Sequence, residues 1–229
     1  MRAGRVRVNG RVASELGLRV VPGEDVVELD GEPITVPSLR WVAFNKPAGV
    51  LTTRGDPHGG STIYDVLPED LRGLRYVGRL DRDAEGLLLL TNDGDGVHAL
   101  QHPSGEVERE YRLEVAGTVT PATVRRLLDG VELEDGPAVA TRARVVEAGP
   151  IVSTLTLTIA EGRKREVRRM LSAVGHAVLR LRRTRFGPVR LGNLGPGAWR
   201  PLSDAERDGL DRLAERTPRR ERGADGSQG

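Results

Sequence analysis

Three carboxylates stand close together between two apolar segments, in the run Gly78-Arg79-Leu80-Asp81-Arg82-Asp83-Ala84-Glu85-Gly86. Such a loop could hold a metal ion, and Asp81, Asp83 and Glu85 fall at the first, third and fifth positions of the calcium-loop template. The template fails further on, because Asn92 stands where a bidentate glutamate is required and Leu87 to Leu90 fill the positions before it. We therefore expect no metal here. Asp81 is either a reactive carboxylate or an ordinary turn aspartate.

Other cofactor signals are weak. His98 and His102 have a metal-ligand spacing, but Pro103 follows at once and no third ligand is evident. The chain has no GxxxxGK or GxGxxG run, which speaks against a nucleotide cofactor. It also has no cysteine, which excludes disulfides and thiolate zinc sites and fits a reducing compartment. We expect a cytoplasmic protein without cofactor, membrane segment or metal.

Positive charge is concentrated in one segment. Residues 161–190 hold ten basic and two acidic side chains, a net charge of +8, so the rest of the chain carries −6 of the formal +2. This pattern indicates a polyanion site, and a solvated helix face is the alternative. Only two of the 35 basic residues are lysines, and both lie in runs of interest. The basic residues expected to contact a polyanion are Lys46, Arg79, Arg163, Lys164, Arg165, Arg169, Arg182 and Arg183.

The elements that must position these residues follow an α+β pattern with a mainly antiparallel sheet. We expect strands over residues 40–45, 75–80, 87–90 and 110–115, and alternation predicts two more over 140–147 and 153–160. Helices are expected over 95–101 and, opened by Pro121 after the cap residue Thr120, over 121–128. Residues 165–174 are predicted as a helix because Val167, Met170, Leu171 and Val174 share one face. Arg168 lies nearest that apolar stripe, so it can reach a half-buried partner.

Three runs occur in an order that resembles the RsuA/RluB family of ribosomal RNA pseudouridine synthases. They are Asn45-Lys46-Pro47-Ala48-Gly49-Val50-Leu51-Thr52-Thr53, the stretch from Val77 through Asp81 to Gly94, and Glu161-Gly162-Arg163-Lys164-Arg165-Glu166-Val167-Arg168-Arg169-Met170. The runs His102-Pro103-Ser104, Val107 to Tyr111 and Gly130 to Pro137 are similar to the RluB branch, which acts on large-subunit RNA. The resemblance covers residues 1–203.

The resemblance implies a role for three residues. Asp81 matches the essential aspartate, Tyr111 the tyrosine that stacks on the target base, and Arg168 the basic residue that forms a salt bridge with the aspartate. An arginine beside an aspartate favours the charged form and fixes its orientation. The implied reaction isomerises uridine without a cofactor after the base has left its stack. Whether Asp81 attacks the sugar or removes a ribose proton stays open, and a core tyrosine remains the alternative at Tyr111.

The expected domains are a partial S4-like RNA-binding segment at residues 1–37, a catalytic domain at 38–216 and a disordered polar tail at 217–229. The first segment resembles only the second half of an S4-type domain. The resemblance implies action on 23S ribosomal RNA, either free or in a ribosome assembly intermediate, by a monomer. A 16S-specific synthase and a non-catalytic RNA-binding or ribosome-assembly factor are the alternatives.

Overall fold

The computed structural model describes residues 4–15, 18, 20–21, 24–34 and 38–216 of the chain. The chain divides into two compact units, Met1–Leu39 and Arg40–Gly229, so the division lies two residues beyond the boundary expected from the sequence. The tail predicted to be disordered, 217–229, falls outside the described residues.

The first unit contains a four-stranded antiparallel sheet with the order β2-β1-β3-β4. Its tight turns need backbone that glycine and asparagine tolerate: φ is 50° at Asn9 and 77° at Gly10, and it is 55° at Asp30 and 88° at Gly31. The strands are β1 (Val6–Val8), β2 (Arg11–Val12), β3 (Val27–Leu29) and β4 (Glu32–Pro33).

The second unit is built on a nine-stranded mixed sheet, whose main path is β11-β12-β8-β13-β7-β5-β15, while β14 pairs with β13 and β6 with β7. Within that path only β13 and β7 run parallel. This confirms the predicted α+β class. The strands are β5 (Trp41–Lys46), β6 (Arg75–Val77), β7 (Glu85–Thr91), β8 (Arg109–Ala116), β11 (Arg142–Glu147), β12 (Val152–Ile159), β13 (Val178–Phe186), β14 (Val189–Arg190) and β15 (Trp199–Pro201), beside a separate hairpin of β9 (Val131–Leu133) and β10 (Gly136–Ala138).

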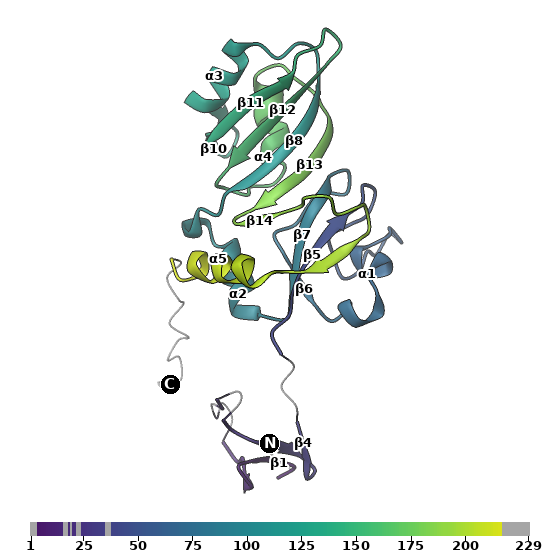
Figure 1. The fold of residues 1–229 in the computed structure, drawn as a ribbon, viewed down its shortest axis with the longest axis vertical. Coiled ribbons are helices and arrows are strands. Elements are labelled where there is room, and N and C mark those ends of the chain that lie inside the picture. The colour runs from purple at the N-terminus through teal and green to yellow at the C-terminus, as the bar shows by residue number, and fades with distance from the viewer. Residues whose placement is uncertain (1–3, 16–17, 19, 22–23, 35–37, 217–229) are drawn as a thin grey trace, which may run out of the picture. The chain divides into compact units, whose positions relative to one another are not determined.

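Helices cover the sheet in two places. The helices α3 (Pro121–Asp129) and α4 (Glu166–Ala173) lie together against β11, β12, β8 and β13, whereas α2 (Gly94–Gln101) and α5 (Asp204–Ala214) pair with each other near β6 and β14 (Figure 1). The short helices are α1 (Ile63–Val66), η1 (Glu69–Leu71) and η2 (Pro103–Gly105). No helix among the described residues is long and apolar enough to cross a membrane.

Strand β7 joins the two apolar cores of the unit. Leu88 and Leu90 pack into the core that also holds the buried residues of α1, α3 and α4, and Leu87 and Leu89 pack into the other, beside Leu100 and Leu210 of α2 and α5. All four leucines of β7 are fully buried, which explains why this segment reads as an unbroken apolar run. The carboxylate loop, residues 78–84, lies between β6 and β7, and because these two strands pair with each other they fix where the loop begins and ends.

Gly86 permits the close parallel contact between β7 and β13. Its φ is 105°, and a Cβ atom at this position would lie 2.4 Å from the main-chain oxygen of Arg183. Only glycine combines this backbone with such an approach. The carboxylate loop is thus joined to β13 through backbone contact at its end.

Candidate active site

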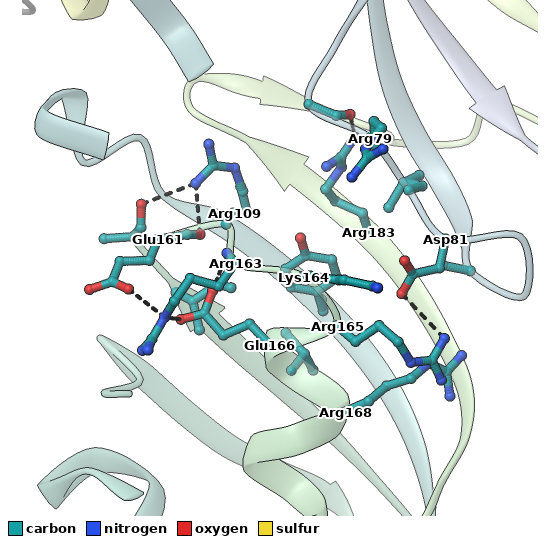
Figure 2. Close-up of a pocket in the computed structure, with 18 of the residues that line it drawn as sticks. Arg79, Asp81, Arg109, Glu161, Arg163, Lys164, Arg165, Glu166, Arg168 and Arg183 are labelled. Carbon is teal, nitrogen blue, oxygen red and sulfur yellow. Dashed lines mark hydrogen bonds and ion pairs between the residues drawn. The ribbon is translucent and has the colours of Figure 1, made fainter. Parts of the chain in front are cut away.

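A pocket of about 870 Å³ opens beside the carboxylate loop, residues 78–84 between β6 and β7. The other walls come from the start of β8, from residues 101–106, and from the turn and first helical residues at 159–168 (Figure 2). Seven basic side chains line it: Arg79, Arg109, Arg163, Lys164, Arg165, Arg168 and Arg183. The carboxylate loop, Tyr111 and the basic turn at 163–165 therefore meet in one place, although they are far apart in the sequence.

Asp81 points into this pocket from the carboxylate loop, with its side chain 36% exposed. Its Oδ2 atom lies 3.7 Å from Nη1 of Arg165, the ion pair drawn in Figure 2. The same Nη1 atom lies 3.5 Å from Oδ1 of Asp83. Arg165 therefore bridges the two aspartates of the loop.

The predicted salt bridge between Arg168 and Asp81 is not formed. Nη2 of Arg168 lies 2.9 Å from Oδ2 of Asp83, and its Nη1 donates to the main-chain oxygen of Val178 at 2.9 Å. The reason is local geometry. Arg165 is the N-cap residue of α4 with a left-handed φ of 51°, so it lies outside the helical turn that carries Arg168. Arg168, inside the first turn, is anchored by the start of β13.

Tyr111 lies on the inner wall of the pocket and is 8% exposed. It belongs to β8, whose odd-numbered residues face α3 and α4, and it stands opposite Arg183 of β13 and Leu157 of β12 in the sheet register. The neighbouring pocket residues Leu80 and Leu181 are also buried. A flat ring among aliphatic side chains is a surface on which a base can stack.

Two predicted RNA contacts, Lys46 and Arg183, are buried and hold the carboxylate loop. Nζ of Lys46 donates to the main-chain oxygens of Ala84 at 2.7 Å and Pro47 at 3.0 Å, and burial lowers the pKa of Lys46 to about 8. Arg183 donates from Nε to Leu87 at 2.7 Å and from Nη2 to Gly78 at 3.1 Å. In this structure the donors of both side chains, which were expected to face RNA, bind main-chain carbonyls in and beside the loop.

Arg163 and Arg169, also predicted as RNA contacts, are occupied by the β9–β10 hairpin. Arg163 donates to the main-chain oxygens of Asp135, Gly136 and Pro137, and Arg169 forms two hydrogen bonds with the Asp135 carboxylate, at 2.7 and 2.9 Å. These bonds pull the Asp135 pKa below its usual range. The hairpin carries a carboxylate and three carbonyls to the site, which the linear sequence did not connect with these arginines.

The remaining predicted contacts fall into two sets. Arg79 and Lys164 line the pocket and are exposed, and neither has a hydrogen bond or ion pair within the described chain. Arg165 is exposed apart from its contacts with the two aspartates. Arg182 does not line the pocket, because it lies on β13 beside Arg183 and faces the other side of the sheet.

Sequence reasoning missed Arg109. This side chain is 8% exposed, lines the pocket, and donates from Nη1 to the main-chain oxygens of Ala160 at 3.0 Å and Glu161 at 2.7 Å. Its guanidinium lies 5.2 Å from the centre of the Phe186 ring. A signal existed, because strand alternation puts Arg109 on the same face as Tyr111, two residues later.

Glu166 was also missed as a site residue. It is 3% exposed, accepts the main-chain N–H of Arg163 at 3.0 Å and lies 3.5 Å from Nε of Arg163. Burial raises the pKa of its carboxyl. Glu166 fixes the turn of residues 163–165 by accepting the N–H of Arg163, three residues before it, and a glutamate at this spacing was the available clue.

The chain is similar in sequence to known RNA pseudouridine synthases. The family model described as RNA pseudouridylate synthase matches residues 40–173. A relative from Aquifex aeolicus, named an uncharacterized RNA pseudouridine synthase, is 42% identical over 89% of this chain and 82% of its own. A relative from Vibrio cholerae, named ribosomal large subunit pseudouridine synthase B, is 43% identical over 96% of this chain and 71% of its own.

A solved structure described as a pseudouridylate synthase superposes with a TM-score of 0.68 at 31% identity, covering 91% of this chain and 90% of that one. Residues 40–173, which the family model matches, contain the carboxylate loop, Tyr111 and α4. The chain belongs to the RNA pseudouridine synthase family and is a member of its RsuA/RluB type.

Proposed function

We propose that this protein converts a specific uridine of 23S ribosomal RNA to pseudouridine, with Asp81 as its catalytic carboxylate. The observation that carries the proposal is the position of Asp81. It stands on a loop whose carbonyls are clamped from within by Lys46 and Arg183, and it faces a pocket bordered by cations. A carboxylate held in place by its surroundings is suited to act on a substrate that the cations hold by its phosphates.

The reaction balances without an added reagent. The bond between N1 of uracil and C1′ of ribose breaks, the base turns, and a bond from C5 to C1′ forms, while C5 loses a proton and N1 gains one. Asp81 takes part either by attack on C1′ or by removal of a ribose proton. Either route needs the uridine out of its stack, and Tyr111 offers the ring on which the extruded base stacks.

Arg165 contacts the Asp81 carboxylate directly, and Arg168 affects it only through the loop, by holding Asp83, two residues along. We propose that Arg168 keeps the loop in place and that it moves to Asp81 or acts through Asp83 when RNA displaces Arg165 towards a phosphate. A bidentate fork suits both carboxylate and phosphate partners, so this exchange needs no new chemistry.

The large subunit is favoured by the relative from Vibrio cholerae, whose name specifies it. The two other readings make different predictions. A 16S-specific synthase modifies small-subunit RNA through the same site. A ribosome-assembly factor without activity binds RNA and has no need for Asp81, Tyr111 and the cations to share one pocket.

The test is to incubate wild type and the Asp81→Asn variant with 23S and 16S transcripts and to map pseudouridine by carbodiimide-blocked primer extension. We expect one or few stops in the 23S RNA with wild type and none with Asp81→Asn. Asp83→Asn is the matched control, because it removes the same charge from the same loop, and a smaller loss is expected from it. Undiminished conversion by Asp81→Asn would refute the assignment, and stops confined to 16S RNA would replace the substrate.

A further inference from the structure

The side of the sheet that faces away from α3 and α4 carries a row of cations. Strand alternation puts Ala143 and Val145 against the helices and turns Arg144 to the other side, as it does for Arg112 next to Tyr111. The register then aligns four residues across four neighbouring strands. These are Arg144 of β11, Thr156 of β12, Arg112 of β8 and Arg182 of β13.

The side chains of the three arginines of this row have no hydrogen bond or ion pair to the described residues of the chain. Nearby carboxylates are occupied: Arg180 binds Glu114 at 3.1 Å and Glu85 at 3.0 Å, and Glu110 accepts the Thr184 hydroxyl at 2.8 Å. Arg112 and Arg182 stand directly opposite each other, an arrangement of like charges that destabilises a sheet. A bound anion would relieve that repulsion.

We infer that the row Arg144–Thr156–Arg112–Arg182 binds the phosphate backbone of an RNA segment that flanks the target uridine; this rests on the proposed function. Guanidinium groups and threonine hydroxyls are common phosphate donors. Adjacent strands lie about 4.8 Å apart, so the row offers donors across about 14 Å. The row is therefore long enough to contact more than one phosphate.

Chemistry and position favour RNA over an acidic protein. The row has no aromatic or methionine side chain, and those are the residues enriched at the centres of protein interfaces. It also ends beside the site, because Arg182 pairs in register with Glu85 of β7, the residue that follows the carboxylate loop. RNA that leaves the pocket past this loop reaches the row at Arg182.

The experiment compares the double variant Arg112→Gln/Arg144→Gln with Arg125→Gln/Arg216→Gln. The control pair also removes two exposed arginines that have no side-chain partner in the described chain, but it does so on α3 and after α5. Binding to the 23S transcript is measured by filter retention over a series of salt concentrations. Conversion is measured on the transcript and on a short fragment around the mapped uridine. Thermal unfolding checks both proteins, and Arg144→Gln alone, on the edge strand β11, serves if the double variant is unstable.

The expected result is roughly tenfold weaker binding of the transcript, with a log–log salt slope shallower by about 1.4 to 1.8, and unchanged conversion of the short fragment. Transcript binding equal to that of the control pair would overturn the inference, and so would an equal loss of conversion on transcript and fragment. If wild type modifies neither RNA, the proposed function fails, and the binding comparison still decides whether the row contacts RNA.

Discussion

Two groups of cationic side chains surround the site: the buried ones hold the backbone, and the exposed ones face the pocket. Lys46, Arg109 and Arg183 are buried, have no carboxylate within ion-pair distance in the described chain, and donate to main-chain carbonyls. Arg79 and Lys164 line the same pocket but stay exposed. Irregular loops leave carbonyls that no strand or helix satisfies, so a buried cation can replace the missing donors. The comparison teaches that residue type alone does not separate a scaffold cation from a substrate contact.

The largest effect is expected from Arg183→Met. The change removes two charge-assisted hydrogen bonds, to Leu87 and Gly78, from a fully buried position and leaves space beside Phe186. We expect the free energy of unfolding to fall by about 3 kcal/mol, measured by urea denaturation.

Arg182→Met is the control for this variant, since the two arginines are neighbours on β13 that face opposite sides of the sheet. Its side chain has no partner in the described residues, and a change within about 0.5 kcal/mol is expected. Equal losses from the two substitutions would show that burial does not separate the two groups.

The next largest effect is expected from Lys46→Met, for which the chain supplies its own control. Lys46 and Lys164 are the chain's two lysines, one fully buried and one exposed. Removing the donor to Ala84 and Pro47 should cost about 2 kcal/mol of unfolding free energy, because methionine fills the space but cannot donate. Lys164→Met should leave stability unchanged. A stable Lys46→Met protein with normal turnover would contradict the scaffold role.

The same lysine predicts a pH dependence. Burial places the pKa of Lys46 at about 8 in the folded protein, against the ordinary 10.5. Between these two values the unfolded chain holds more protons, so the contribution of Lys46 to stability rises with pH and is lost as pH falls through this window. From pH 7 to pH 9, wild type should gain about 1 kcal/mol relative to Lys46→Met. Urea denaturation of both proteins at the two pH values measures it, and a constant difference between them would exclude this titration.

How far the sequence predicts the molecule depends on where side chains are buried. The helix over 165–174 was predicted because its apolar residues recur at helical spacing, and α4 spans Glu166–Ala173. Strand β13 was not predicted, because Arg183 and Arg185 are buried at positions where a strand pattern calls for apolar residues. Helix α5 was also missed, although Ser203 and Glu206 form a capping box visible in the sequence.

The candidate site was likewise predicted only in part from the sequence. Ordered motifs located Asp81, Tyr111 and the basic turn, which line one pocket. They did not reveal which arginine contacts which aspartate, because that depends on the left-handed backbone at Arg165 and on the carbonyl of Val178 that holds Arg168. Nor could they reveal that Asp135 occupies Arg163 and Arg169, since the β9–β10 hairpin meets α4 only in the fold. Local sequence patterns therefore identify the site residues, whereas the partners of those residues depend on long-range packing.

The smallest effect is expected from Lys164→Gln, and it tests the exposed group. Lys164 lies between Arg163, which holds the β9–β10 hairpin, and Arg165, which holds the aspartates, yet it has no partner in the described chain. A cation left free between two engaged neighbours and directed at the pocket is available for one phosphate. Affinity for the 23S transcript should fall a few-fold, the log–log salt slope should become shallower by about 0.7 to 0.9, and the urea midpoint should not move. A shifted midpoint with an unchanged slope would place Lys164 among the scaffold cations, and the division by burial would then fail at its simplest case.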